Sequence, residues 1–225
     1  MPSVLITGAN RGLGFEFARQ YAADGWQVFA TCRHPDSASA LRGLNGRVAL
    51  IELDVVDEES IRNAAVLIEE PVDLLINNAG IIGPSERTGR VDCEAWREVF
   101  EVNTIGPLRV VEAFTGHLAR SERKMVVTVT SGMGSIGDNS SGGSLPYRSS
   151  KAAVNMVMRT VAIDLADRGI ISVVINPGWV KTDMGGPNAP FTASVSVDAI
   201  RRVIATLGLA DSGKFLNHDG REYPW

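Results

Sequence analysis

Seven short apolar runs alternate with longer helical patterns along the 225 residues of this chain, and this alternation constrains the fold more than any other feature. The runs are VLIT at 4–7, QVFAT at 27–31, VALIEL at 48–53, VDLLI at 72–76, KMVVTVT at 124–130, ISVVIN at 171–176 and KFLN at 214–217. The first six are apolar almost throughout, which is typical of strands covered on both faces of a parallel sheet. Helices are predicted near 12–24, 57–69, 92–119, 147–168 and 196–208, with a weaker one near 36–44. The pattern predicts an α/β, doubly wound fold: a mostly parallel, seven-stranded sheet with helices on both faces.

Length and composition limit the possible partners. The length suits one α/β domain over 1–225. The net charge is only −4, so no basic excess is available to hold nucleic acid. No apolar run approaches the roughly 18 residues of a membrane span, and no charged leader precedes the first strand, so we expect a soluble, cytoplasmic protein without a membrane partner. Cys32 and Cys93 lack metal-ligand spacing and are interpreted as reduced core thiols, and no metal site is predicted.

A glycine-rich segment, TGANRGLG at 7–14, follows the first strand and opens the first helix. Gly8, Gly12 and Gly14 permit a tight turn and close backbone approach, which leaves the amides of the helix N-terminus free for an anion such as pyrophosphate. The spacing is G-x-x-x-G-x-G, which differs from the G-x-G-x-x-G dinucleotide fingerprint. A glycine turn without a ligand is the alternative, and the strand-to-helix context favours the anion site.

The end of the second strand bears on the choice of cofactor. A cofactor without a 2′-phosphate would meet an acidic side chain there, but the chain reads ATCRHP, with Cys32 and Arg33 at this position. Arg33 and Arg11 could converge on a 2′-phosphate, for which the guanidinium is geometrically suited. The alternative is two solvated surface arginines. The sequence therefore favours NADP(H) over NAD(H).

Five further motifs follow the later strands: NNAG at 77–80, VNTIG at 102–106, TSGMG at 130–134, YRSSK at 147–151 and NPGWVKTDM at 176–184. With the glycine segment, and in this order over nearly the whole chain, they resemble the short-chain dehydrogenase/reductase family. The segments GKFLNHDGREYPW and GWVKTDMGGPNAP further resemble the subgroup that contains the sniffer carbonyl reductase and the C-factor proteins. The resemblance implies a Rossmann fold with strand order 3-2-1-4-5-6-7, and a homodimer or homotetramer.

The same resemblance implies the cofactor contacts. The pyrophosphate and the adenosine ribose would lie against Gly8, Asn10, Arg11, Gly12 and Leu13, with Arg33 on the 2′-phosphate. The adenine would meet Asp54 and Val55, and the central channel would be lined by Asn78, Ala79 and Gly80. The nicotinamide end would be held by Pro177, Gly178, Val180, Thr182 and Met184.

Hydride transfer to a carbonyl develops negative charge on oxygen, so such a site needs a positioned proton donor. Tyr147 would be that donor; a free tyrosine has a pKa near ~10, and a nearby cation favours its phenolate. Lys151 lies one helical turn on, on the same face, and by resemblance it also binds the nicotinamide ribose. The resemblance further implies that Ser131 binds the substrate oxygen and that Asn103 holds a water for proton supply. An incidental helix pair is the alternative for Tyr147 and Lys151, and the surrounding motifs favour catalysis.

The spacing between the serine and the tyrosine departs from the family pattern. Sixteen positions separate Ser131 from Tyr147, which is longer than usual in the family, and the extra residues fall in DNSSGGS at 138–144. A glycine and serine loop can absorb that length at little entropic cost. Ser135 remains a rival for the role of Ser131. Substrate-pocket candidates are Met133, Trp179 and Phe191, for which ordinary core packing is the alternative, and 185–194 is expected to form a small lid.

These observations predict an NADP(H)-dependent oxidoreductase that transfers hydride between the nicotinamide and a carbonyl or alcohol carbon of a small, apolar substrate, in the manner of a carbonyl reductase. An NAD-dependent alcohol dehydrogenase is the alternative among enzymes. A cofactor-binding signalling protein similar to the C-factor proteins is the alternative from another class, since a fold alone does not fix function.

Overall fold

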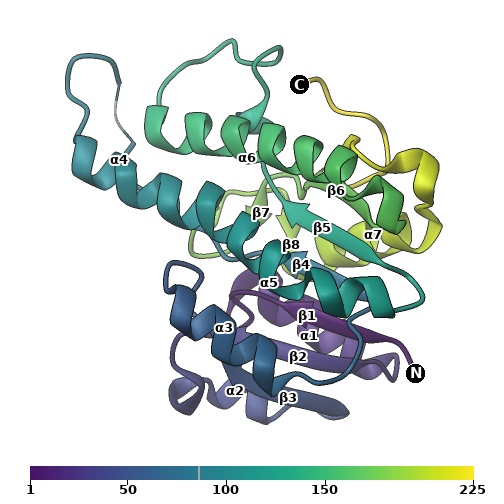
Figure 1. Ribbon diagram of the computed structural model, residues 1–225. Coiled ribbons are helices and arrows are strands. Elements are labelled where there is room, and N and C mark those ends of the chain that lie inside the picture. Colours follow the sequence, from purple (N-terminus) through teal and green to yellow (C-terminus); the bar gives the residue numbers. More distant parts are fainter. Residues whose placement is uncertain (86) are drawn as a thin grey trace.

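The structure is a computed structural model that describes residues 1–85 and 87–225. Within these residues the main sheet has seven strands, all parallel, in the order β3-β2-β1-β4-β5-β6-β9. The strands are β1 (Ser3–Ile6), β2 (Gln27–Cys32), β3 (Arg47–Glu52), β4 (Leu74–Asn77), β5 (Met125–Val129), β6 (Ile171–Asn176) and β9 (Phe215–Asn217). The predicted doubly wound fold and its strand order are therefore confirmed (Figure 1). The seventh strand of this sheet is labelled β9 because β7 and β8 belong to a separate small sheet.

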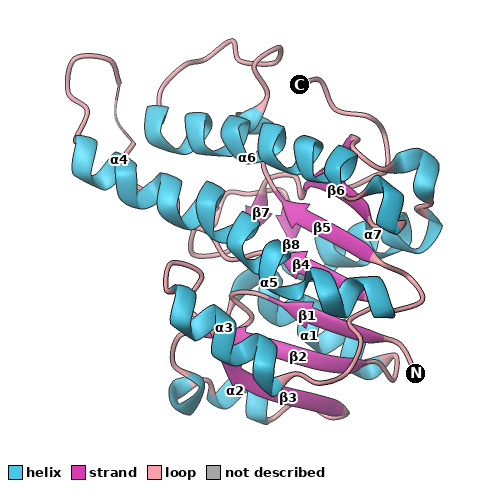
Figure 2. Ribbon diagram, in the orientation of Figure 1, coloured by secondary structure: helices cyan, strands magenta, loops and turns pink. Residues whose placement is uncertain are grey.

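Helices cover both faces of this sheet. They are α1 (Gly12–Ala23), α2 (Ser39–Arg42), α3 (Glu58–Leu67), α4 (Cys93–Phe100), α5 (Gly106–Arg120), α6 (Leu145–Asp164) and α7 (Ala193–Thr206). Helices α3, α5 and α6 pack on one face, and α1, α2 and α7 pack on the other (Figures 1 and 2). None of the helices in 1–85 and 87–225 is both long and apolar enough to cross a bilayer.

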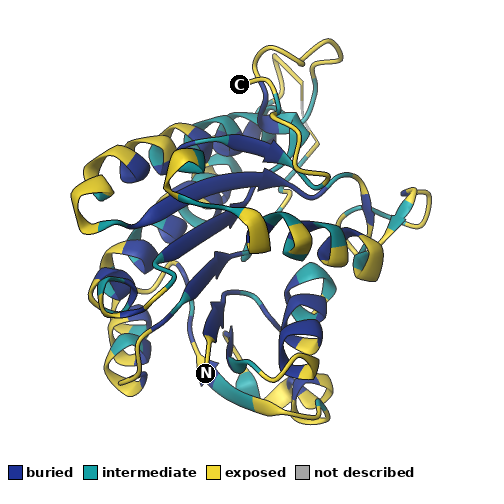
Figure 3. Ribbon diagram, turned by 90° about the vertical axis from the view of Figure 1, so that its right-hand side faces the viewer, coloured by how far each residue is buried: buried dark blue, intermediate teal, exposed yellow. Residues whose placement is uncertain are grey.

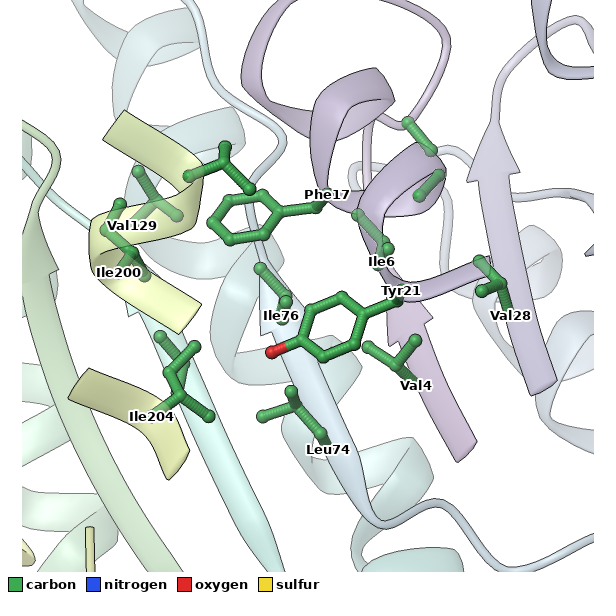
Figure 4. Packing of buried hydrophobic residues seen from close by; sticks show 14 of the residues in the cluster. Val4, Ile6, Phe17, Tyr21, Val28, Leu74, Ile76, Val129, Ile200 and Ile204 are labelled. Carbon is green, nitrogen blue, oxygen red and sulfur yellow. The ribbon is translucent and has the colours of Figure 1, made fainter. Parts of the chain in front are cut away.

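Each central strand supplies residues to two separate cores, because successive side chains of a strand point to opposite faces. Val4 and Ile6 pack with Phe17 of α1 and Ile200 of α7 (Figure 4), whereas Leu5 packs in the cluster beneath α3, α5 and α6. Strands β1, β2, β4, β5 and β6 are consequently buried along nearly their whole length, whereas the edge strand β3 is only partly buried (Figure 3). Burial on both faces explains why the strand sequences read as continuous apolar runs.

Side-chain caps define where several helices begin. Asp57 accepts hydrogen bonds from the backbone N–H groups of Glu59 and Ser60 at the start of α3, at 2.9 and 3.3 Å. Asp92 does the same at the start of α4, and Thr192 accepts from Val195 N in the first turn of α7. Such caps satisfy amides that have no partner within the helix.

The helix predicted over 92–119 is interrupted. Between α4 and α5, residues Glu101–Ile105 form a π-helical segment. The hydrophobic pattern continues through this segment, so it contains no sign of the change in winding. Segments of this kind are frequent at functional sites, and here the segment contains Asn103.

Two smaller features also differ from expectation. Residues that follow β6 form a second, two-stranded sheet of β7 (Val180–Lys181) and β8 (Phe191–Thr192), which pair in parallel. Cys32 and Cys93 are both free thiols, but Cys93 is exposed and does not belong to the core, because it is the first residue of α4 and faces solvent there.

Candidate active site

The predicted site residues follow four neighbouring central strands. The glycine segment follows β1, Asn78 follows β4, Ser131 follows β5 and Pro177 follows β6. Because these strands are parallel and adjacent, their carboxyl ends share one edge of the sheet (Figure 1). Ligands bind at this edge in open α/β sheets.

The glycine segment forms a tight cradle that side chains would fill. Gly8 and Gly12 have φ values of 65° and 56°, in the left-handed region that favours glycine. A Cβ on Gly14 would lie 2.3 Å from Gly8 O and 2.5 Å from Asn78 Nδ2. Within the described ranges no side chain caps the first turn of α1, so its amides stay free for an anion.

Asn78 joins this cradle to the next strand. Its Nδ2 donates to the carbonyl oxygens of Thr7 and Gly8, at 2.9 and 3.1 Å. In return, the Thr7 hydroxyl accepts from the backbone N–H groups of Asn78 and Ala79, at 3.0 and 3.1 Å. Asn78 and Ala79 therefore help to hold the shape of the glycine turn from the β4 side, while Gly80 lies beside Asn103 and Lys151.

The two arginines predicted at a 2′-phosphate differ in their surroundings. Arg11 forms an ion pair with Asp183 at 3.0 Å, and both side chains are largely exposed; such pairs contribute little stability. Arg33 follows β2 and is exposed, with no hydrogen bond or ion pair to any residue that the structure describes. Asp54 lies just beyond β3, where its carboxylate accepts from Val56 N at 3.2 Å. Its neighbour Val55 is buried.

Tyr147 and Lys151 lie in the first two turns of α6, and both are buried, with 7% and 5% of their surfaces exposed. Lys151 Nζ is 5.8 Å from the centre of the Tyr147 ring and donates to the carbonyl oxygen of Val129 at 3.0 Å. An ammonium has three donors, and the other two have no partner in 1–85 or 87–225. These two donors are available to a ligand.

Burial shifts the pKa values of both groups toward their neutral forms. It lowers the pKa of Lys151 to about 8. Burial also raises the pKa of Tyr147, and a hydrogen bond with Ser131 offsets part of that rise. A nearby cation is predicted to lower the pKa of the tyrosine, but in the protein alone burial dominates and raises it. The phenol therefore holds its proton at neutral pH.

Ser131 is positioned by backbone contacts at the end of β5. Its Oγ accepts from Met133 N at 3.1 Å and begins a short 3₁₀ turn over Gly132–Gly134. The amide of Gly132 donates to Asn176 Oδ1 at 2.9 Å. Asn176 Oδ1 also accepts from Gly178 N at 3.2 Å, so one buried amide ties the serine turn to the segment that follows β6.

Both side-chain N–H groups of Asn103 are used in hydrogen bonds within the protein. Its Nδ2 donates to Ile81 O at 2.8 Å and to Ser150 Oγ at 3.0 Å, and its Oδ1 accepts from Ile81 N at 2.9 Å. The Thr104 hydroxyl donates to the carbonyl oxygen of Ser150 at 3.0 Å. The π-helical segment is thus held against α6 three residues beyond Tyr147. Only the second acceptor position of Asn103 Oδ1 is left for a water.

Ser135, the rival for the serine role, is held in other contacts. It is buried, its Oγ donates to Trp225 O at 3.2 Å, and it accepts from Asp138 N at 3.0 Å. Gly137 N also donates to Trp225 O, at 2.8 Å. The hydroxyl of Ser135 therefore anchors the residues 223–225 to the loop after β5.

The segment after β6 approaches both the glycine turn and Tyr147. Thr182 Cγ2 lies 3.5 Å from the position of a Cβ on Gly12, and Tyr147 Oη donates to Met184 Sδ at 4.0 Å. Pro177 O accepts from Ser196 Oγ at 2.7 Å, and Gly178 has a φ of 78°. Val180 is buried within β7.

The three predicted pocket residues fall in two places: Trp179 and Phe191 are neighbours, because Phe191 N donates to Trp179 O at 3.3 Å, whereas Met133 lies in the loop after β5. Met133 lines a cavity of about 620 Å³ between the loop after β5 and α6, and neither Trp179 nor Phe191 lines that cavity. Trp179 is 56% exposed and donates from Nε1 to Gly185 O at 2.7 Å. Phe191 lies against His218, with ring centres 4.8 Å apart.

Sequence reasoning missed two buried polar residues that position the site. Asn176 connects the serine turn to Gly178. Ser150 accepts hydrogen bonds from the side chains of Asn103 and Thr104. Asn176 had a detectable signal, because a polar residue ends an otherwise apolar strand at the ligand edge. Ser150 had none, since a serine inside a helical pattern is more often exposed.

A family model described as short chain dehydrogenase matches residues 2–192 of the chain. The chain belongs to this family. The chain is 45% identical over 155 residues to the C-signal of Myxococcus xanthus. The match covers 69% of this chain and 93% of that protein. The match confirms the family to which the motifs pointed.

Solved structures of two carbonyl reductases superpose on the whole of this chain. The carbonyl reductase Sniffer of D. melanogaster has a TM-score of 0.95 and 32% identity, with full coverage of both chains. The NADPH-bound carbonyl reductase from chicken fatty liver has a TM-score of 0.94 and 35% identity, and the match covers 100% of this chain and 99% of that one. The chain therefore has the same fold as these carbonyl reductases. This agrees with the resemblance of its sequence to the subgroup that contains the sniffer carbonyl reductase.

Proposed function

We propose that this protein is an NADP(H)-dependent carbonyl reductase that transfers hydride between the nicotinamide and a carbonyl or alcohol carbon of a small substrate. The observation that carries the proposal is the pair of Tyr147 and Lys151, buried together at the ligand edge of the sheet beside Ser131. A buried ammonium with unused donors is costly unless a ligand meets it. Hydride chemistry gives both residues a role.

The residues at the ligand edge fit a dinucleotide. A Cβ on Gly14 would collide with the backbone of the turn, and the uncapped amides of α1 suit a pyrophosphate. The guanidinium of Arg33, which has no partner among residues 1–85 and 87–225, suits a 2′-phosphate, and the chicken carbonyl reductase binds NADPH. The other proposed contacts are Asn10, Arg11, Leu13, Asp54, Val55, Asn78, Ala79, Gly80, Pro177, Gly178, Val180, Thr182 and Met184.

NADPH, when bound, supplies the hydride. Tyr147, protonated at neutral pH, donates its proton to the developing alkoxide, and the Ser131 hydroxyl binds the same oxygen. Lys151 then stabilises the phenolate that is left, because an opposite charge close by favours the ionised form. The two donors of Lys151 that have no partner in 1–85 or 87–225 would hold the nicotinamide ribose, and Asn103 Oδ1 would hold a water for return of the proton.

The direct test is NADPH oxidation measured with the purified protein against aldehydes, ketones and quinones, repeated with NADH. We expect turnover of several carbonyl compounds and faster turnover with NADPH. Turnover with NADH alone would favour the NAD-dependent alcohol dehydrogenase.

A signalling role is the second candidate, because the chain shares 45% identity with the C-signal of Myxococcus xanthus. The two functions differ in a simple measurement. A protein that binds NADPH tightly but turns over no carbonyl compound in a broad panel would support a binding role. Turnover that depends on Tyr147 would support the reductase.

We infer one domain over residues 1–225, a small substrate-side lid at 185–194, and a homodimer or homotetramer. Met133, Trp179 and Phe191 stay predicted substrate contacts, and a cytoplasmic location stays a prediction. Size-exclusion chromatography with light scattering measures the oligomeric state directly.

A further inference from the structure

Arg148, the residue directly after Tyr147, binds the loop that precedes its own helix. Its Nε donates to the carbonyl oxygens of Gly142 and Gly143, both at 3.2 Å. One terminal nitrogen donates to Ser141 Oγ at 2.7 Å, and the other approaches Met133 O at 3.4 Å. A single guanidinium thus connects α6 to both ends of the segment between Ser131 and Tyr147.

The bound part of this loop has an uncommon backbone. Gly142, Gly143 and Ser144 are consecutive residues with φ values of 59°, 72° and 46°. A left-handed conformation at a serine carries a strain that the surroundings must offset. These residues are also part of the extra length between Ser131 and Tyr147, and in the view of Figure 2 the loop arches above the first turns of α6.

The two halves of the loop have separate anchors. Ser135 and Gly137 in the first half bond to Trp225 O, and Tyr223 Oη donates to Asp138 at 2.8 Å. The second half, 141–143, is held to α6 by Arg148. Loss of Arg148 therefore releases the second half while the serine turn keeps its contacts with Asn176 and with residues 223–225.

The loop forms one wall of the 620 Å³ cavity. The cavity is lined by residues of this loop from Met133 to Gly143, by residues of α6 that include Arg148 itself, and by Arg87 and Thr88. Apart from Arg87 and Arg148, its lining side chains are apolar or uncharged, among them Met133, Ile136, Asn139, Leu145 and Ala152. Ile136 is 79% exposed, which suits a wall that an apolar group covers.

We infer that Arg148 is a positioning residue of the proposed reaction: it fixes residues 141–143 as the wall of a subsite that receives the apolar substituent of the carbonyl substrate. This inference rests on the proposed function. Arg148 touches neither Ser131 nor the hydroxyl of Tyr147, so its effect is on the fit of the substituent and not on the proton transfer. A short substrate that leaves the subsite empty is indifferent to it.

The test compares wild type and Arg148→Met on straight-chain aldehydes from propanal to decanal, with NADPH. We expect KM for decanal to rise about tenfold in the variant, the equivalent of one or two lost contacts, with KM for propanal and both kcat values nearly unchanged. Arg148→Lys should recover only part of the loss, because an ammonium lacks the fork that spans several acceptors.

Arg159→Met is the matched control, because Arg159 lies on the same helix and also donates to a loop carbonyl, that of Gly213 at 2.8 Å. It is eleven residues along α6 from Arg148, or about 16 Å at the helical rise. Ile136→Trp, which fills the cavity, should reduce turnover of decanal and spare propanal. Thr206→Trp fills a second cavity of about 630 Å³ beside α7 and should change neither.

Hydrogen exchange provides a readout that does not need turnover. Amides 139–144 should exchange faster in Arg148→Met than in wild type or Arg159→Met, while amides of β5 and α6 stay protected. Unchanged exchange in this loop, or a rise in KM that is equal for propanal and decanal, would overturn the inference. Wild type that turns over no carbonyl compound, with the exchange result as expected, would refute the proposed function and the subsite but leave the loop anchor in place.

Discussion

Replacing Lys151 with methionine should make the protein more stable at neutral pH while it removes activity. The lysine is buried, and burial lowers its pKa from 10.5 to about 8. Both folded and unfolded chains carry the proton below pH 8, so the full cost of burying the ammonium is present there. That cost is about 3 kcal/mol at pH 7, from 1.36 kcal/mol for each pKa unit.

The sign of the pH dependence follows from proton uptake. Between pH 8 and 10.5 the unfolded chain keeps a proton on Lys151 that the folded chain has lost, so wild-type stability rises with pH in this window. At pH 10 the cost falls to about 1 kcal/mol. The variant also loses the hydrogen bond to Val129 O, which offsets about 1 kcal/mol at any pH. Lys151→Met should therefore be about 2 kcal/mol more stable at pH 7 and equal to wild type near pH 10.

Urea unfolding of both proteins without cofactor, at pH 7 and pH 10, measures this difference. Other titrating groups cancel because they are common to both chains. For a chain of this size the gain at pH 7 corresponds to a rise in Tm of about 4–8 °C. A variant that is less stable than wild type at pH 7, or a difference that does not change with pH, would show that Lys151 is not a desolvated ammonium.

Other substitutions test the cofactor site. Arg33→Asp should shift the preference from NADPH toward NADH, by about tenfold or more in the ratio of kcat/KM values; an unchanged affinity for NADPH, measured by fluorescence titration, would show that Arg33 does not meet the 2′-phosphate. Gly14→Ala should weaken binding of both cofactors and lower Tm, because its Cβ would lie 2.3 Å from Gly8 O. Gly25→Ala, at a position where a Cβ meets no atom within 4 Å although φ is 78°, controls for loss of glycine freedom; an equal loss of cofactor affinity in both variants would argue against a specific collision.

Much of the fold could be predicted from the sequence because parallel strands leave a strong signal. The continuous apolar runs located all seven strands of the main sheet to within a few residues. The turn chemistry at Gly8 and Gly12 likewise places both glycines at left-handed φ values. These features depend on local sequence, where propensity and pattern agree.

Features that depend on tertiary contacts could not be predicted. The π-helical segment around Asn103 is held by bonds to Ile81 and Ser150, which lie far away in sequence. The pKa of Tyr147 depends on the balance of burial and charge, and only the packed site shows that burial dominates in the protein alone. Arg148 carried no signal either, because an arginine in a first helical turn usually points to solvent.

The most direct test of the central claim is Tyr147→Phe, which removes one hydroxyl and keeps the buried ring. Turnover of a carbonyl compound with NADPH and the Kd for NADPH are measured on the same preparations. The account predicts that turnover falls by about a thousandfold, on the scale of a lost general acid, while the Kd stays within about twofold. Turnover equal to that of wild type would contradict the assignment of Tyr147 as the proton donor.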